Sequence, residues 1–255
     1  MLDAFLKTPY GLATFIVFDV VAVVAILAIG YRWLFKRFFD LLAACVSIVC
    51  VSPLLLVVVI RGKLFQKNTE NLSTLMRKVY RVGKKERTVA LHEFRTLDDD
   101  GDEAGAYGAW LARTGLYKLS YLFDIFLGRL SFIGVRALDM TDAAFTDEDV
   151  ETRFFVRPGL IHPLCLRTDE ETGYEELFAA ETRYENKLGL FGDLRIFFVW
   201  LVRTIRGEKN EWWGETREKS YALALLESGE ITQEDYDTVK EDVESELAAL
   251  DGEQE

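Results

Sequence analysis

The stretch KRFFDLLAACVSIVCVSPLLLVVVIRGK, residues 36 to 63, decides how the N-terminal part of this chain folds. Its apolar run is long enough to reach across a bilayer, for which about 20 apolar residues suffice. Pro53 lies inside the run, and a proline bends or breaks a helix, so the hydroxyl of Ser52 is expected to satisfy backbone groups there. Basic residues flank both ends, which favours keeping both ends on one side of a membrane. We therefore expect a broken, re-entrant helix, with a plain spanning helix as the alternative.

A second apolar run, Tyr10–Gly30, precedes this stretch and is interrupted by Thr14 and Asp19. Its length favours a transmembrane helix. A secretory signal peptide is the alternative, but the run is long and lacks a basic leader and a small-residue cleavage site. Arg32 and Lys36 follow the run, so the positive-inside rule places residue 32 onward in the cytoplasm. Asp19 is costly at bilayer depth and is therefore a candidate functional residue, or else a helix-packing or water-contacting one.

The composition of the whole chain excludes several classes of function. Its 255 residues carry a formal net charge of −12, whereas a nucleic-acid-binding face needs a basic surface, so we expect no nucleic-acid partner. The three cysteines and two histidines are scattered and lack the spacing of a disulfide framework or of a metal site. The length fits one main domain with appended segments.

Beyond residue 66 the sequence is mixed and polar, and its patterns predict helices with a little strand. Residues 88–91 alternate as a short strand, and apolar residues recur at helical spacing over residues 106–130. The acidic segment 98–103 lacks the Glu that would complete a calcium-binding loop, so a solvated loop is expected. Residues 193–206 predict an amphipathic helix, which suits either a membrane interface, together with the tryptophans at 212 and 213, or the domain core.

Two segments in the middle of the chain resemble a known signature. Residues 113–123 read RTGLYKLSYLF, and residues 130–136 read LSFIGVR. They resemble the motifs of the bacterial sugar transferases, the monotopic polyprenyl-phosphate phosphoglycosyl transferases, which read Thr-Ser-Leu-Asp-Glu-Leu-Pro-Gln and then Met-Ser-Leu-Val-Gly-Pro-Arg-Pro. The resemblance extends from about residue 32 to residue 206. Its other motifs, in chain order, are Lys36-Arg37-Phe38-Phe39-Asp40, Ser52-Pro53, Arg81-Val82-Gly83-Lys84, His92-Glu93-Phe94-Arg95-Thr96-Leu97, Val156-Arg157-Pro158-Gly159-Leu160, Tyr184-Glu185-Asn186 and Asp193-Leu194-Arg195-Ile196.

The resemblance implies a reaction and the place of its catalytic residues. In the family, a carboxylate of the Asp-Glu pair attacks the β-phosphate of a UDP-sugar, UMP leaves, and polyprenyl phosphate then accepts the phosphosugar, with Mg²⁺ offsetting phosphate charge. The pair falls on Tyr117 and Lys118 in this chain. With ordinary pKa values of about 10 and about 10.4, these side chains supply neither an anionic nucleophile nor a good Mg²⁺ ligand at pH 7. The catalytic pair is therefore not intact, and Mg²⁺ is expected as a cofactor only if the protein is active.

The resemblance also implies which residues bind substrate. Arg95, Arg136 and Arg157 match family arginines, and a guanidinium suits bidentate contact with phosphate. A structural ion pair is the alternative for each of them. Changes at several other motif positions favour loss of catalysis over a single replaced nucleophile. These changes are Glu93 for Lys, Ser120 and Tyr121 for Pro-Gln, Val135 and Ala137 for two prolines, and His162 for Gly.

The resemblance therefore predicts a membrane-bound homologue that has lost its chemistry and acts as a scaffold or regulator in cell-surface polysaccharide assembly. Its implied partners are the lipid bilayer, polyprenyl phosphate, a UDP-sugar, and either further copies of itself or an active homologue. One alternative is an active transferase that moves a phosphosugar from a UDP-sugar to polyprenyl phosphate, with Tyr117 as a non-standard nucleophile beside Lys118. Another is a module that binds a lipid or a nucleotide sugar without turnover.

The C-terminal segment from Ala222 to Tyr236 resembles the short module called SHOCT, with its Leu-x-x-Gly-x-Ile-Thr pattern. Gly229 is expected to end a first helix, and Thr232 to cap a second helix that has Asp235 in its first turn. The hairpin has too few apolar residues for a core of its own, so we expect it to pack on another surface and to mediate protein contacts. These apolar residues are Leu225, Leu226 and Ile231.

The expected fold is an α-rich α+β membrane-associated domain with four parts. They are an N-terminal transmembrane helix (1–31), a re-entrant broken membrane helix (32–66), a sugar-transferase-like domain with amphipathic interface helices (67–213) and an acidic C-terminal helical hairpin (214–255). The resemblance places the protein in the bacterial cell membrane, with its main domain on the cytoplasmic face.

Overall fold

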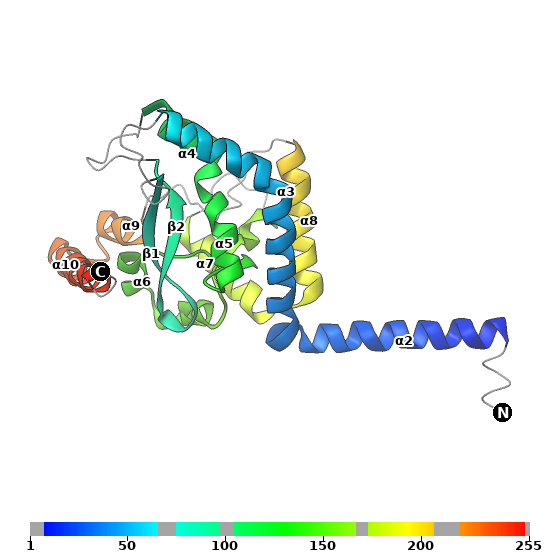
Figure 1. Cartoon of the computed structure of the whole chain (residues 1–255). Helices are drawn as coiled ribbons and strands as arrows, with labels where there is room; N and C mark the ends of the chain where they lie inside the picture. The colour runs from blue at the N-terminus through cyan, green and yellow to red at the C-terminus, as the bar shows by residue number, and fades with distance from the viewer. Residues whose placement is uncertain (1–7, 66–74, 97–104, 167–172, 207–219, 253–255) are drawn as a thin grey trace.

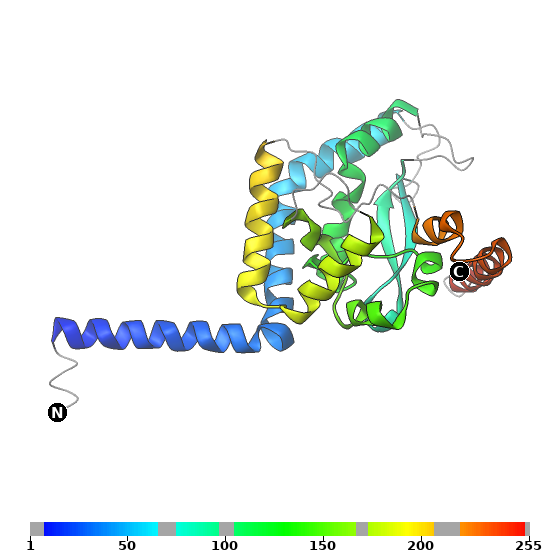
Figure 2. The ribbon, with the colours of Figure 1, turned by 180° about the vertical axis from the view of Figure 1, so that it is seen from behind.

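The computed structural model describes residues 8–65, 75–96, 105–166, 173–206 and 220–252. It begins with two long helices, α2 (Pro9–Gly30) and α3 (Lys36–Phe65), joined by the π-helical turn η1 (Tyr31–Phe35). Both helices are long and apolar enough to cross a membrane. α2 projects away from the domain in both views (Figures 1 and 2), and the side chain of Asp19 is exposed on it. The prediction of two long apolar helices at the N-terminus is confirmed.

α3 bends where the sequence places Pro53, but it does not break. Pro53 has no N–H to donate to the carbonyl of Val49, one turn earlier. The hydroxyl of Ser52 donates a hydrogen bond of 2.8 Å to that same carbonyl and so replaces the missing donor. Helical structure continues through the proline, and Figure 1 shows α3 changing direction about halfway along its length. The helix is therefore bent at the site where a break was expected.

Buried carboxylates fix the start of α3 against the domain. Asp193, on α8 (Leu190–Arg206), accepts hydrogen bonds from the hydroxyl of Tyr31 and the ammonium of Lys36, each at 2.6 Å. A buried charge is costly without partners, so breaking these bonds would be unfavourable. They therefore hold the junction between α2 and α3 against the domain. A second buried carboxylate, one turn along α3, does the same: Asp40 accepts from the Ser131 hydroxyl at 2.7 Å and from the Phe132 N–H at 2.9 Å.

Two small sheets form the centre of the domain. β1 (Met76–Val82) and β2 (Thr88–Phe94) pair antiparallel, and the short turn η3 (Lys84–Glu86) connects them. β3 (Ser131–Ile133) and β4 (Gly159–Ile161) pair in parallel. The strand predicted over residues 88–91 lies within β2, so that prediction is confirmed, and the mostly helical fold with a small sheet is confirmed as well.

The helical spacing over residues 106–130 corresponds to three separate helical pieces. They are α4 (Gly105–Thr114), the 3₁₀ turn η4 (Leu116–Ser120) and α5 (Tyr121–Leu127). Gly115 has a φ of 69°, a left-handed conformation that glycine adopts without steric cost and that ends α4. The helical spacing predicted there is confirmed over most of its length, and the division places η4 on a sharp turn beside the sheet.

The rest of the domain is helical. It consists of α6 (Met140–Ala144), η5 (Glu148–Phe155), η6 (Pro163–Leu166) and α7 (Tyr174–Asn186), followed by α8. α8 lies beside the first half of α3 in both views (Figures 1 and 2). The amphipathic helix predicted near the end of the domain is confirmed, because α8 exposes one apolar stripe: Phe191, Leu194, Phe198, Val202 and Ile205. The acidic segment 98–103 and the tryptophans at 212 and 213 lie outside the described residues.

The C-terminal segment forms two helices, α9 (Tyr221–Ser228) and α10 (Gln233–Gly252). Gly229 ends α9 with a φ of 79°, as expected from the sequence. Thr232 and Asp235 cap α10 reciprocally, since the Asp235 N–H donates to the Thr232 hydroxyl at 3.2 Å and the Thr232 N–H donates to the Asp235 carboxylate at 3.1 Å. The helix ends predicted for the hairpin therefore agree with the structure.

The start of this hairpin docks on the domain of the same chain. Asp142, on α6, accepts hydrogen bonds from the Ser220 hydroxyl at 2.6 Å and from the Ala222 N–H at 3.1 Å. The ring of Tyr221 packs 5.1 Å from Tyr174 and 5.0 Å from Phe178, measured between ring centroids. The hairpin thus packs on α6 and α7 of its own chain. Its role in association with other proteins stays a prediction.

Candidate functional site

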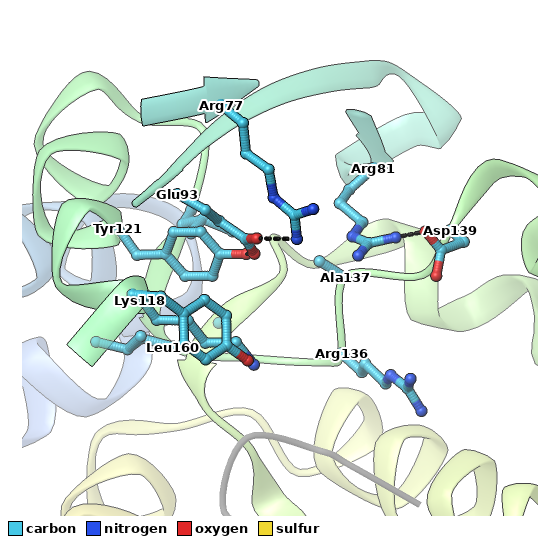
Figure 3. Close-up of a pocket in the computed structure, with 12 residues that line it drawn as sticks. Arg77, Arg81, Glu93, Lys118, Tyr121, Arg136, Ala137, Asp139 and Leu160 are labelled. Atoms are coloured by element: carbon cyan, nitrogen blue, oxygen red, sulfur yellow. Dashed lines mark hydrogen bonds and ion pairs between the residues drawn. The ribbon is translucent and has the colours of Figure 1, made fainter. Parts of the chain in front are cut away.

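A pocket of about 260 Å³ opens between β1, β2, η4, β4 and the segment that follows β3 (Figure 3). Four of its described lining side chains are cationic and two are carboxylates, so the pocket carries net positive charge and suits an anionic ligand. The polar residues of the lining are Arg77, Arg81, Glu93, Tyr117, Lys118, Tyr121, Arg136 and Asp139.

Tyr117 and Lys118 sit on η4 and both line this pocket. The turn at Gly115 ends α4 just before them, which directs η4 back across the end of β2. The ammonium of Lys118 lies 5.3 Å from the centre of the Tyr117 ring, a cation–π distance. The two positions that match the catalytic pair of the resembled family therefore lie at a pocket, on neighbouring residues of one turn.

Glu93 is a buried carboxylate in the wall of the pocket. It lies on β2 directly opposite Arg77 of β1, which donates to it at 3.0 Å (Figure 3). The hydroxyl of Tyr121 donates to the same carboxylate. Burial and the Glu93 charge hold the pKa of Tyr121 well above its usual range, so this hydroxyl remains a donor at neutral pH. Glu93 thus neutralises one arginine of the pocket from within.

The second carboxylate of the pocket lies at its edge. Asp139 forms an ion pair with Arg81 of β1, and its side chain is 52% exposed (Figure 3). Burial lowers the pKa of Arg81, but a guanidinium remains charged at physiological pH. Both carboxylates of the described lining therefore already have a cationic partner.

The peptide of Arg136 is clamped from both sides by a buried network. Its N–H donates to Glu181 at 2.6 Å, and its carbonyl accepts from Arg153 at 2.7 Å. Arg153 and Glu181 also form an ion pair at 3.1 Å, and both side chains are almost completely buried. The guanidinium of Arg136 extends from this fixed backbone and donates to the hydroxyl of Tyr174 at 3.2 Å. The core of the domain thus sets where this arginine meets the pocket.

His162 completes the network under Arg136. Its Nδ1 accepts from the backbone N–H of Leu164 at 3.0 Å, so Nε2 carries the proton and donates to Glu181 at 2.9 Å. Burial lowers the pKa of His162, which keeps the ring neutral at pH 7. Burial alone would raise the pKa of Glu181, but Arg153 and His162 hold it below its usual value. The histidine found at a family glycine position is therefore a buried structural residue.

A sequence model of the family described as "Bacterial sugar transferase" matches residues 31–207, which is more than half of the chain. This chain belongs to the bacterial sugar transferase family. The match begins at the turn before α3 and ends just after α8, so it covers the bent apolar helix and every described residue that lines the pocket. The resemblance drawn from the motifs is confirmed, while α2 and the C-terminal hairpin lie outside the matched residues.

Several individual named proteins are similar to this chain. An uncharacterized sugar transferase, EpsL of Bacillus subtilis, is 25% identical over 185 residues, which cover 68% of this chain and 88% of the relative. The exopolysaccharide production protein ExoY of Rhizobium meliloti is 25% identical over 190 residues, covering 64% and 82%. A UDP-N-acetylgalactosamine-undecaprenyl-phosphate N-acetylgalactosaminephosphotransferase of Aeromonas hydrophila is 28% identical over 140 residues, covering 49% and 32%.

The structure separates the three arginines that the family motifs suggested. Arg136 lines the pocket of Tyr117, whereas Arg157 lines a different cavity. Arg95 follows β2, where its N–H donates to the carbonyl of Leu75 at 2.9 Å, and it is not among the described residues that line either. Sequence reasoning did not select Arg77, although its spacing from Arg81 on a strand places both on one face.

The pocket of this sugar transferase homologue does not fit Mg²⁺. Magnesium is held by carboxylates, and the two in the described lining, Glu93 and Asp139, are bound to arginines. In the part of the chain that the structure describes, no three His, Cys, Asp or Glu side chains gather in a way that could hold a metal ion. At the family pair itself stand a phenol and an ammonium, which are poor magnesium ligands.

Proposed function

We propose that this protein is a membrane-bound sugar transferase homologue that binds a phosphate-bearing ligand in the Tyr117 pocket and does not transfer a phosphosugar. The observation that carries the proposal is the charge of the pocket: four cations line it, and each of its two carboxylates is already paired with an arginine. Such a lining attracts phosphate oxygens, but it presents neither a free anionic nucleophile nor a magnesium ligand.

The names of the relatives support a class of ligand for the pocket. The relative from Aeromonas hydrophila is named for a UDP-sugar and for undecaprenyl phosphate, and ExoY is named for exopolysaccharide production. We propose that this chain binds a nucleotide sugar or polyprenyl phosphate and takes part in exopolysaccharide production. It would act there as a scaffold or regulator, with copies of itself or with an active homologue as partners. The C-terminal hairpin, outside the family match, is the segment proposed for protein contacts.

The proposal is tested by binding and turnover on the purified full-length protein in detergent. We expect no UMP release from a UDP-sugar, with or without Mg²⁺, and nucleotide-sugar binding that EDTA leaves unchanged. Arg136→Ala should weaken that binding about tenfold to a hundredfold, because a hydrogen bond to a charged group is lost from the pocket. Arg113→Ala, at an exposed arginine of α4, is the matched control and should bind as the wild type does. Magnesium-dependent UMP release would overturn the proposal.

An active transferase is a second candidate, favoured by one observation. The Lys118 ammonium lies over the ring of Tyr117, where a positive charge would stabilise a phenolate. If Tyr117 is the nucleophile, Tyr117→Phe abolishes UMP release and leaves nucleotide-sugar binding intact. Loss of both would instead assign Tyr117 to binding.

We further propose that α3 enters the membrane from the cytoplasmic side and returns to that side, and that the main domain lies there as well. The proposal is supported by the bend at Pro53 and by the basic residues at both ends of α3. Single cysteines at Arg32 and Lys63, in a background without native cysteines, should be labelled from the cytoplasmic side by an impermeant reagent. A cysteine at Thr8 should be labelled from the opposite side. Labelling of the Arg32 and Lys63 positions from opposite sides would mean that α3 crosses the membrane.

A further inference from the structure

A second cavity, of about 450 Å³, is lined by basic residues from three segments. Lys84, Lys85 and Arg87 come from the connection between β1 and β2, Arg129 follows α5, and Arg157 precedes β4. None of the described residues that line the cavity is acidic. Five cations around one opening create a strongly positive potential that favours an anion.

Most of these cations have no counter-charge among the residues that the structure describes. Among the described residues, no carboxylate forms an ion pair with Lys84, Arg87 or Arg157, and the same holds for Lys85. Partial desolvation, followed by the positive charges of Arg157, Lys85 and Arg32, lowers the pKa of Lys84. The fold therefore holds like charges together at a cost, which a bound anion would offset.

The turn that carries the lysines has an unusual backbone. Lys85 has a φ of 60° and Glu86 a φ of 57°, left-handed values that residues other than glycine rarely adopt. Backbone strain of this kind is found at sites where function requires a particular arrangement. Here it aims basic side chains at the cavity that Arg157 lines from the other side.

An apolar groove of about 470 Å³ adjoins the basic cavity, and Arg129 lines both. Arg129 is held at this boundary by Asp124, to which it donates at 2.8 Å. The groove runs between α5 and the half of α3 that follows the bend. Its apolar lining includes Leu55, Leu56, Val59, Phe123 and Leu127. A basic cavity that continues into an apolar groove suits an amphiphilic ligand, one with an anionic head and an apolar tail.

The cavity lies where the apolar helices join the domain. Arg37, one residue into α3, donates to the carbonyls of Ile125 at 2.6 Å and Phe126 at 2.8 Å. Its guanidinium lies against Gly128 of the cavity lining, 3.2 Å from where a Cβ would stand. Figures 1 and 2 both show the β1–β2 turn at the same end of the domain as the α2–α3 junction. A ligand that enters here can come from the bilayer.

We infer that the basic cavity and the apolar groove together hold one anionic phospholipid of the bilayer. Its phosphate headgroup lies on Lys84, Arg87 and Arg157, and an acyl chain lies in the groove beside α5. A soluble phosphate would leave the groove empty, and an apolar protein segment would leave the cations unneutralised. The site is separate from the Tyr117 pocket, because the described linings of the pocket and of these two cavities have no residue in common. The inference rests on the membrane placement proposed above.

Native mass spectrometry of the full-length protein tests this site. The protein is reconstituted in nanodiscs of phosphatidylcholine with phosphatidylglycerol as the minor lipid and is then released into mild detergent. Wild type should retain one phosphatidylglycerol. The triple variant Lys84→Gln, Arg87→Gln, Arg157→Gln should bind it on the order of a hundredfold more weakly, at about fivefold for each charge removed. The triple variant Lys78→Gln, Arg113→Gln, Lys240→Gln removes the same charge from exposed positions elsewhere and should retain the lipid.

Three results would overturn the inference. Equal retention of phosphatidylcholine would show that the site does not distinguish lipids by headgroup charge. Displacement of the lipid by inorganic phosphate would assign the cavity to a soluble anion. Retention of polyprenyl phosphate in place of phosphatidylglycerol would make it an acceptor site. Nucleotide-sugar binding measured on the same triple variant should be unchanged, because its substitutions lie outside the Tyr117 pocket. Failure of the lipid site and failure of the proposed function are thereby distinguished.

Discussion

Replacing Glu181 with leucine is expected to lower the free energy of unfolding by about 3–5 kcal/mol, because it leaves the buried guanidinium of Arg153 without its counter-charge. The change also removes the acceptor for the Arg136 N–H and for Nε2 of His162. For a chain of this size the melting temperature should fall by roughly 10 °C. Circular dichroism of the purified full-length protein in detergent measures this shift.

Two control variants separate the charge effect from a simple loss of packing. Glu175→Leu, at an exposed position on α7, should change the melting temperature little. Combining Arg153→Leu with Glu181→Leu should recover much of the loss, because replacing both members of a buried ion pair with apolar residues is often neutral. If Glu181→Leu melts as the wild type does, Arg153 has another counter-charge and the network does not fix Arg136.

The same network predicts how stability depends on pH. Arg153 and His162 hold the pKa of Glu181 below its usual value in the folded protein despite its burial. A lowered carboxylate pKa contributes stability that is fully present above the ordinary Glu pKa of about 4.3 and is lost as the pH falls through the folded-state value. The wild type should therefore lose this contribution on acidification, and Glu181→Leu should not show that part of the acid dependence.

The sequence predicts much of the N-terminal and C-terminal structure because the signals there are local. Long apolar runs give α2 and α3, Pro53 marks the bend, and Gly229 ends α9. The break at Gly115 is not marked in the sequence pattern, because apolar residues keep a helical spacing on both sides of it and a lone glycine does not by itself end a helix. Local patterns thus predict elements better than they predict the interruption that shapes the site.

The site was harder to predict because it depends on contacts between distant segments. The motif positions Tyr117 and Arg136 do meet at one pocket, but Arg157 lies in another cavity. The pairing of Arg77 with Glu93 follows from the register of β1 against β2, which the sequence alone does not give. A comparison of motif residues identifies Glu93 as a departure from the family. Only the structure shows that its carboxylate neutralises the charge of Arg77 in the pocket.

Glu93→Gln is expected to tighten the binding of a nucleotide sugar to the Tyr117 pocket, on the order of tenfold to a hundredfold in Kd. The carboxylate of Glu93 repels phosphate and occupies Arg77, which donates to it at 3.0 Å. Glutamine has nearly the same shape and keeps an oxygen that can accept from Tyr121, so the fold should be preserved. Isothermal titration of the full-length protein with a UDP-sugar measures the change.

Glu175→Gln removes the same charge from an exposed position on α7 and should leave the affinity unchanged. Weaker or equal binding by Glu93→Gln would mean that the carboxylate orders the pocket more than it repels the ligand. Tighter binding without UMP release would show that two separate changes distinguish this pocket from an active family site. One is the carboxylate that neutralises Arg77, and the other is the missing nucleophile at Tyr117 and Lys118. Charge then governs how tightly the ligand is held, while the chemistry of η4 governs whether it reacts.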